Sequence, residues 1–279
     1  MPEAAPGGAD LVCIRAPNPG PMTLSGTNTY VVGREPAWVI DPGPDDAGHI
    51  EAVRAEGEIR GGIAGVLLTH SHADHTAGVA GLGAPVLWGA VSEGDEMRPA
   101  VGGAAGAAAR TDPSGDHPPV AKRVSSRVSV PGTPLAALPT PGHAADHACF
   151  LWADVLFCGD LILGEGSTIV PPEALGGSLV DYLRSLELVH DLDAKLFAPG
   201  HGSWITDPRT KISEYLAHRR ERERKLLAAL AGGERSRARL LDAAWSDVPA
   251  QLRPAAALAM QAHLEKLEAE GRGTLELTD

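Results

Sequence analysis

The chain has 279 residues, of which 43% are hydrophobic, so it is long enough for one large globular domain or two unequal ones. Its 36 acidic and 24 basic residues give a net charge of −12, which argues against the basic footprint of a duplex DNA binder. No apolar run could cross a bilayer, residues 1–8 lack the basic end and apolar centre of a signal peptide, and three cysteines form no disulfide framework. We therefore expect a cytoplasmic protein with no membrane contact.

Residues 10–90 are predicted to form short strands followed by one strand–helix unit. Residues 63–68 (IAGVLL) are a continuous apolar run, as expected for a strand that is covered on both faces. Four potential metal ligands follow within residues 69–75 (THSHADH). Core packing does not call for three histidines and an aspartate so close together, whereas zinc accepts imidazole and carboxylate ligands in catalytic sites. We therefore predict a metal site at the carboxyl end of this strand, where open α/β folds place their sites.

The spacing within this run favours two adjacent metal ions over one. In an extended loop, His70 and His72 are two residues apart and point the same way, so they can share one ion. Asp74 and His75 are neighbours that point differently, so they more naturally reach a second position. Residues 76–81 (TAGVAG) then open a small-residue segment that suits a short helix.

Residues from about 91 to 120 are low in complexity, with an Ala- and Gly-rich run at 102–109 and prolines from 113 to 119. An Ala-rich helix is one alternative for this stretch, but its composition favours a mobile surface loop. His117 lies within it and is expected to be solvated rather than a ligand.

Residues 121–208 return to strands, with one helix interposed at 179–191. Three strand-like runs here end in a further potential ligand, punctuated by Gly or Pro: His143 in LPTPGH, Asp160 in VLFCGD and His201 in LFAPGHG. Pro-Gly before a histidine suits a tight turn that brings backbone and imidazole close to a site. Strands that first pair as hairpins and then alternate with helices predict an α/β fold of the αβ/βα type, two packed sheets with helices outside.

Beyond Pro208 the pattern becomes helical. Helices are predicted at 208–231, closed by two glycines, at 236–245 and at 251–271, followed by a short strand at 274–277. We expect a catalytic domain over residues 1–208 and a small winged-helix-like domain over 209–279. Segment 209–239 has ten basic and four acidic residues. It is interpreted as a solvated helix face, with a patch for phosphate groups as the alternative.

Several of these motifs resemble the metallo-β-lactamase superfamily, which carries this His-x-His-x-Asp-His run followed by a His, an Asp and a final His. The closer likeness is to its β-lactamase-like protein 2 branch, which has a C-terminal winged-helix module. That likeness rests on residues 18–30 (NPGPMTLSGTNTY), 159–168 (GDLILGEGST) and 199–202 (PGHG), and on 211–219 (KISEYLAHR). The resemblance covers most of the chain and departs from it mainly at 101–119.

The resemblance implies a dinuclear site in which every ligand position is filled. His70, His72 and His143 would hold the first zinc, Asp74, His75 and His201 the second, and Asp160 would bridge the two. Asp74 and Asp160 are also the residues expected to be catalytic. Mn²⁺ or Fe would accept the same ligands as Zn²⁺.

Residues beside the ligands could support them. The family has an acidic residue at the position of Asp41, which could accept the second N–H of a ligand histidine or could simply cap a turn. Asp146 and His147 could shape the site or merely start the next strand. Cys158 is expected to be a core residue.

These expectations describe a metal-dependent hydrolase, most simply one that acts on a small ester or thioester. The resemblance leaves open a single-stranded RNA endoribonuclease and a β-lactam hydrolase. Duplex DNA is not expected as a partner, because Glu265, Glu268 and Glu270 make the third C-terminal helix a poor reader of the major groove. A homodimer remains open. Replacing Arg219, Arg220, Arg222 and Arg224 together by Gln is expected to leave hydrolysis of a small thioester almost unchanged.

Overall fold

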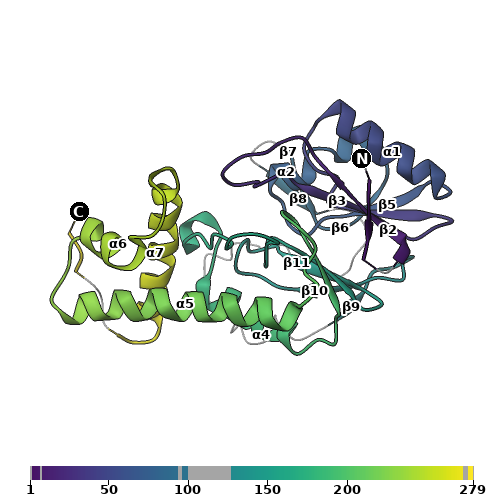
Figure 1. Ribbon diagram of the computed structural model, residues 1–279. Coiled ribbons are helices and arrows are strands. Elements are labelled where there is room, and N and C mark those ends of the chain that lie inside the picture. The colour runs from purple at the N-terminus through teal and green to yellow at the C-terminus, as the bar shows by residue number, and fades with distance from the viewer. Residues whose placement is uncertain (1, 7, 94–95, 100–126, 273–275, 279) are drawn as a thin grey trace, which may run out of the picture.

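The computed structural model describes residues 2–6, 8–93, 96–99, 127–272 and 276–278 (Figure 1). The predicted low-complexity loop and His117 therefore lie largely outside the described residues. The first of two large sheets has six strands in chain order: β1 (Glu3–Ala5), β2 (Gly8–Arg15), β3 (Asn28–Val32), β4 (Ala37–Ile40), β5 (Ile63–Leu67) and β6 (Val86–Trp88). β1 to β4 pair antiparallel, and β4, β5 and β6 are parallel. A separate hairpin joins β7 (Ala90–Glu93) to β8 (Glu96–Pro99).

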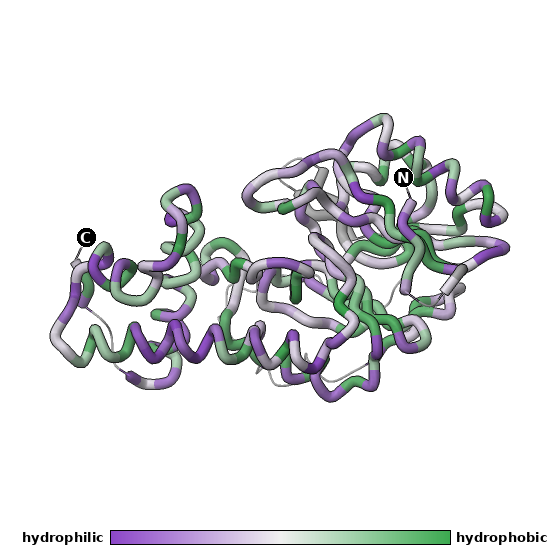
Figure 2. Tube along the Cα trace, viewed as in Figure 1, coloured by the Kyte–Doolittle hydropathy of each residue, from purple (hydrophilic) through white to green (hydrophobic). Residues whose placement is uncertain are grey.

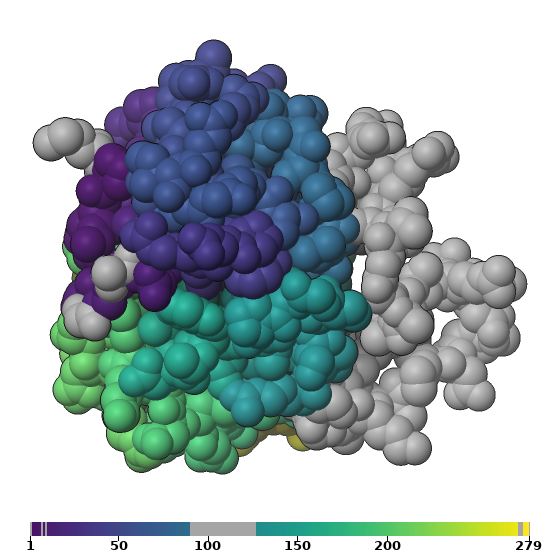
Figure 3. All heavy atoms as spheres, turned by 90° about the vertical axis from the view of Figure 1, so that its right-hand side faces the viewer, coloured from purple at the N-terminus to yellow at the C-terminus, as the bar shows by residue number. Residues whose placement is uncertain are grey.

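The second sheet has five strands, in the spatial order β13 (Leu196–Pro199), β12 (Val155–Gly159), β11 (Ala148–Trp152), β10 (Ala136–Pro139) and β9 (Val128–Ser129). Its pairs are antiparallel except for β12 and β13. β9 has only two residues, and a tight turn joins β11 to β12. Figure 3 shows the N-terminal half of the sandwich, in purple and blue, stacked on the teal and green half.

Apolar side chains fill three layers of the sandwich. Between the sheets lie alternate residues of both, including Tyr30, Leu67 and Phe157, with the rings of Tyr30 and Phe157 5.3 Å apart. The outer face of the first sheet packs on α1 (Ala47–Ile59) and α3 (Val79–Leu82), which follows the short α2 (Ala73–Thr76). The outer face of the second sheet is covered by α4 (Leu179–His190) and the start of α5 (Pro208–Ala231). The predicted αβ/βα sandwich is confirmed.

The C-terminal part is helical, and its first helix has the predicted bounds. The Asp207 side chain accepts from the Thr210 amide, Pro208 occupies the first turn and Gly232 ends the helix. α6 (Arg237–Trp245) and α7 (Arg253–Ala269) follow, joined by η3 (Ala250–Leu252). Their apolar faces pack on the second half of α5. Of the strand predicted at 274–277, residues 274 and 275 lie outside the described residues, and Thr278, just beyond it, forms a parallel bridge with Ser236.

α5 belongs to both parts of the molecule. Ile212 and Tyr215 in its first half pack in the core beneath the second sheet, whereas Leu226 and Leu230 pack with α6 and α7. Figure 1 shows this helix running below both parts, and Figure 2 shows that its middle is hydrophilic. No helix within the described ranges is both long and apolar enough to cross a membrane.

The prediction that the basic stretch of α5 is a solvated face is wrong for two of its arginines. Arg219 and Arg222 are only 4% and 5% exposed, whereas Arg220 and Arg224 are exposed. The reason is the helical period, because residues 215, 219, 222 and 226 share the face that packs on the rest of the protein. The two buried guanidinium groups bind carbonyl and carboxylate oxygens instead of solvent.

Candidate metal centre

All seven predicted ligands come together where strands end. The run from His70 to His75 follows β5, His143 follows β10, Asp160 follows β12 and His201 follows β13. Three subsets of them have donor atoms within 4.8 Å of one another: His70, His72 and His143; His70, His75 and Asp160; Asp74, His75 and His201. Residues far apart in the chain therefore converge on one site, because both sheets direct these loops to the same edge.

The first group consists of three imidazoles. His72 Nδ1 lies 2.9 Å from His70 Nε2 and 3.1 Å from His143 Nε2. His70 and His143 are buried, whereas His72 is exposed. Three nitrogens this close, with no acidic group among them, form a neutral ligand set of the kind that zinc accepts.

The second group adds carboxylates. Asp74 Oδ2 lies 3.3 Å from His201 Nε2 and 3.5 Å from His75 Nε2, and both histidines are buried. The two groups meet at Asp160. Its Oδ1 is 3.5 Å from His75 Nε2 and 3.4 Å from His201 Nε2, whereas its Oδ2 is 3.7 Å from His143 Nε2. One carboxylate thus presents one oxygen to each group.

The donor set fits metal ions better than it fits hydrogen bonding alone. His75 Nε2 and Asp160 Oδ1 are fully buried, yet neither has a hydrogen-bond partner among the described residues. Buried polar atoms are almost always satisfied, so two orphaned atoms that face each other indicate a missing ligand. Divalent cations bound between these groups would satisfy both.

The inward orientation of the imidazoles is set by the contacts of their other nitrogens. His75 Nδ1 donates to Asp41 Oδ2 at 2.9 Å, and Asp41 also accepts from the Thr69 amide and hydroxyl, each at 2.7 Å. Because the Thr69 hydroxyl donates to Asp41, it can only accept from His70 Nδ1, 3.0 Å away. Asp41 thus orients two ligands and does more than cap a turn. The backbone of Asp41 has a φ of 51°, in the left-handed region.

Backbone carbonyls orient two further ligands. His143 Nδ1 donates to the Ile169 carbonyl at 2.8 Å, and His201 Nδ1 to the Gly26 carbonyl at 3.3 Å. In His70, His75, His143 and His201 the Nδ1 proton is therefore engaged, which leaves the Nε2 lone pair for a metal.

Sequence reasoning missed Thr27, which is fully buried and whose hydroxyl donates to Asp74 Oδ2 at 3.1 Å. Asn18 holds Thr27 in turn through two hydrogen bonds. The Asn18 side-chain amide donates to the Thr27 hydroxyl, and the Thr27 main-chain amide donates to the Asn18 side-chain oxygen. Both residues lie in segment 18–30, so the family motif was a signal that could have pointed to them.

Two glycines allow the close approach expected of the Pro-Gly-His turns. A Cβ on Gly200 would lie 2.5 Å from Asp160 Oδ1 and 2.7 Å from His75 Cε1. A Cβ on Gly142, whose φ is +139°, would lie 2.3 Å from the Tyr182 Cα of α4. Any side chain at these positions would displace the Asp160 carboxylate or the loop that carries His143.

The electrostatics differ between the two groups. Burial lowers the pKa of His70 well below its usual value and that of His72 to about 4, so both are neutral near pH 7. Burial also opposes the charging of His75 and His201, but the carboxylates of Asp160 and its neighbours outweigh it and raise their pKa values to about 9 and 10. The second group is thus a concentration of negative charge that attracts protons when no other cation is present.

The remaining candidates lie beside the site. His147 is buried below it, with its ring centroid 5.3 Å from that of His70 and its Nδ1 2.9 Å from Thr140 Oγ1. Burial raises the pKa of Asp146 above its usual value, although a hydrogen bond from Ser71 acts in the opposite direction. Cys158 is buried in the core, as predicted. None of these three supplies a donor atom to the ligand groups.

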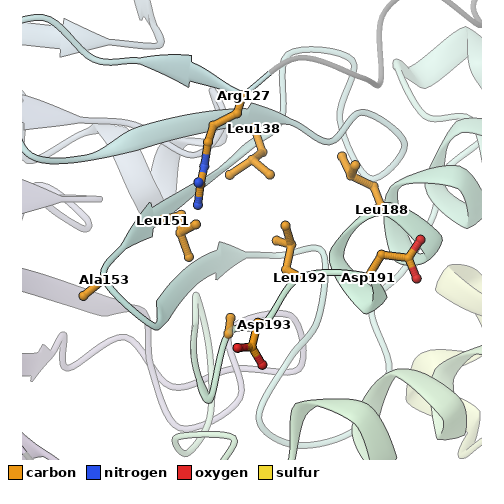
Figure 4. Close-up of a pocket in the computed structure, with 9 residues that line it drawn as sticks. Arg127, Leu138, Leu151, Ala153, Leu188, Asp191, Leu192 and Asp193 are labelled. Carbon is orange, nitrogen blue, oxygen red and sulfur yellow. The ribbon is translucent and has the colours of Figure 1, made fainter.

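A cavity of about 460 Å³ lies away from this centre. Figure 4 shows Leu138, Leu151 and Leu192 around it, with Arg127 at one side and Asp193 at another. Ala153 precedes β12 and Ala194 precedes β13, so the cavity opens at the ends of these strands opposite to Asp160 and His201. It therefore does not belong to the metal centre.

The chain is similar to proteins of known family over most of its length. Residues 22–201 match the family described as "Metallo-beta-lactamase superfamily", and residues 238–273 match "Beta-lactamase associated winged helix domain". The second match confirms the winged-helix-like C-terminal domain, whose predicted boundary near residue 208 stays a prediction.

Two relatives and one solved structure illustrate the similarity. The chain is 31% identical to the "Beta-lactamase-like protein 2 homolog" of Drosophila melanogaster, over 95% of this chain and 89% of the relative. It is 32% identical to an "Atrochrysone carboxyl ACP thioesterase" of Aspergillus fumigatus, over 90% and 78%. The crystal structure of a metallo-beta-lactamase family protein from Thermus thermophilus superposes with a TM-score of 0.68 at 26% identity, covering 95% of this chain and 96% of the other.

Proposed function

Because this chain belongs to the metallo-beta-lactamase superfamily, and within it to the beta-lactamase-like protein 2 branch, it is a hydrolase, and we propose that it uses two zinc ions to cleave a small ester or thioester. His70, His72 and His143 would hold one ion, Asp74, His75 and His201 the other, and Asp160 would bridge them. Mn²⁺ or Fe are alternative ions for the same ligands.

The observation that carries the proposal is the position of the Asp160 carboxylate. Its two oxygens face two different groups of histidines, and Oδ1 has no hydrogen-bond partner among the described residues although it is buried. A bridging carboxylate also reduces the repulsion between two dications, which favours two ions over one.

The chemistry follows from the ligand set. Bound to these residues, a divalent pair would supply a nucleophile from water near neutral pH and would stabilise negative charge on the oxygen of an attacked acyl group. Hydrogen bonds to Asp41, Thr69, Thr27 and the Ile169 carbonyl orient the proposed ligands toward the place where the ions would bind.

Two considerations favour an acyl ester or thioester over single-stranded RNA as the substrate. A relative that aligns with 90% of this chain is named as a thioesterase. In addition, the basic stretch that could have formed a phosphate patch has Arg219 and Arg222 buried, and Arg224 is paired with Glu221 at 2.7 Å. The burial and pairing of these arginines therefore weaken the argument that α5 carries an RNA-binding surface.

The test is a metal analysis combined with a substrate panel. We expect close to two transition-metal ions per purified chain, loss of turnover on chelation, and recovery with Zn²⁺. The zinc-loaded protein is then assayed on acyl thioesters, lactones, a chromogenic cephalosporin and single-stranded RNA, and thioesters or esters should give the highest kcat/KM. Active protein without stoichiometric metal would overturn the dinuclear mechanism, and faster cleavage of RNA would overturn the substrate class.

A further inference from the structure

The first half of α5 contacts the loop that follows the Asp160 ligand, residue by residue. Lys211 Nζ lies 3.4 Å from the Gly164 carbonyl, and the Tyr215 hydroxyl accepts from the Leu163 amide at 2.9 Å. One turn further, Arg219 Nη2 donates to the Thr168 carbonyl and lies 3.4 Å from Ser167 Oγ. These three α5 residues are four positions apart, so they form one stripe on the helix.

The same loop holds ligands of both candidate ions. The Thr168 hydroxyl donates to the Asp160 carbonyl at 2.5 Å, and the next residue, Ile169, accepts from His143 Nδ1 at 2.8 Å. Thr168 thus lies between the arginine on one side and the backbone of the bridging residue on the other. A shift of its carbonyl would move the acceptor of His143, which is one peptide unit away.

Arg219 is an unusual group to find in this position. Its residue is 4% exposed, its guanidinium carbon lies 5.2 Å from the centre of the Tyr182 ring, and no ion pair of the described residues includes it. Tyr182 in turn donates to the Leu161 carbonyl at 2.7 Å, next to Asp160. A buried cation with only neutral acceptors is costly to desolvate, so its position calls for a role that a neutral side chain would not fill.

We propose that Arg219 is a positioning residue for the metal centre, holding the loop from Asp160 to Ile169 so that His143 and Asp160 present their metal-binding atoms. The inference rests on the proposed function in taking these two residues as metal ligands. It assigns the helix that leads into the C-terminal domain a part in assembling the centre.

The test measures metal affinity directly. Apo-protein is titrated with Co²⁺, followed by its visible absorption, and with Zn²⁺ in competition with a chromophoric chelator. Arg219→Gln keeps a helix former of similar length but removes the charge and the forked donor. We expect roughly 10- to 100-fold weaker binding of at least one ion, the range usual when a group that orients a ligand is lost. The Co²⁺ absorption bands should change as well. Arg219→Lys, which keeps the charge but not the fork, should fall between.

The matched control is Arg220→Gln, which removes the same charge from the next, exposed position of the same helix. It should bind both ions as the unaltered chain does. Equal metal affinities and spectra for Arg219→Gln and the unaltered chain would overturn the inference, as would an equal loss in Arg220→Gln. If Arg219→Gln does not fold, Arg219→Lys supplies the comparison. An unaltered chain that takes up fewer than two ions would instead contradict the proposed function.

Discussion

Each buried histidine at the centre is held by a contact on the side facing away from the ligand group. Three kinds of acceptor do this: the Asp41 carboxylate for His75, the Thr69 hydroxyl for His70, and the main-chain carbonyls of Ile169 and Gly26 for His143 and His201. The ring orientation that directs Nε2 toward the ligand groups is therefore built into the fold before any ion binds.

Replacing the Asp160 carboxylate tests its proposed role as the bridge between two ions. Asp160→Ala removes the group shared by both ligand sets, so we expect loss of metal and of activity together. Asp41→Asn should be milder, with activity roughly 10- to 100-fold lower, because it alters only the orientation of His75 and Thr69. Asn also tolerates the positive φ at this position. Metal content by elemental analysis and kcat/KM provide the measurement.

Circular dichroism provides the control, because both variants should keep the fold. Asp160→Ala protein that retained two ions and full turnover would contradict the assignment of Asp160 as the bridge.

The sequence predicted which His and Asp side chains converge at the candidate centre, but not most of what holds them. Ligand identity is visible because His and Asp are chemically distinctive and follow recognisable apolar strands. The acceptors at Ile169 and Gly26 are main-chain atoms, which every residue type offers, so no pattern marks them. Thr27 is 47 positions from the Asp74 carboxylate that it binds, and only the tertiary fold shows the pairing.

At the scale of helices and strands, long periodic segments were predicted best. The helices at 179–190 and 208–231 lie where their patterns place them, whereas α1 was not predicted separately because two Gly and several charged residues obscure its apolar stripe. Charge misled at Arg219 and Arg222. A run of alternating Arg and Glu suggests a solvated face, but its 3.6-residue period turns these two positions inward.

Arg222 joins α5 to the turn after α6. Its guanidinium donates to the Ala244 carbonyl and, through Nη2, to Asp247 Oδ2 at 2.8 Å. Arg222→Gln should lower the free energy of unfolding by about 1–3 kcal/mol, because a buried carbonyl loses its charged donor. Arg224→Gln breaks an exposed pair with Glu221 and should change it by less than about 0.5 kcal/mol. Urea unfolding of the metal-loaded proteins is the measurement, and equal shifts in the two variants would contradict the burial argument.

The burial of Arg219 and Arg222 also revises the expected outcome of replacing all four arginines, at positions 219, 220, 222 and 224, by Gln. Because Arg219 and Arg222 are buried, the quadruple Gln variant should lose stability and metal affinity, rather than leave hydrolysis of a small thioester unchanged.

At the scale of the whole molecule, the candidate centre lies at one edge of the sandwich, between its two sheets. Ligands from β5 of the first sheet face ligands from β10, β12 and β13 of the second, so ions bound between them would fasten the two sheets at one edge. Hydropathy patterns predicted two packed sheets with helices outside, although they did not locate α1. They could not predict which loops meet, because that depends on how the halves stack.

Metal removal should therefore lower global stability as well as activity. Ions that bind only the folded chain stabilise it by about 2.7 kcal/mol for each site when the free ion exceeds its Kd a hundredfold. We expect a lower melting temperature after treatment with a chelator, and recovery when Zn²⁺ is restored, measured by differential scanning calorimetry. Melting temperatures that did not differ between the two states would show that the centre does not hold the sheets together.

The continuity of α5 limits how this chain can recombine with its relatives. A 24-residue helix is about 36 Å long, and here its first three turns rest on the ligand loop while its last turns form the C-terminal core. A chimera joined at residue 208 would import foreign side chains at positions 211, 215 and 219 and would mismatch the loop beneath them. A workable crossover has to fall inside the helix, after Arg219, so that each parent keeps the helical turns fitted to its own partner.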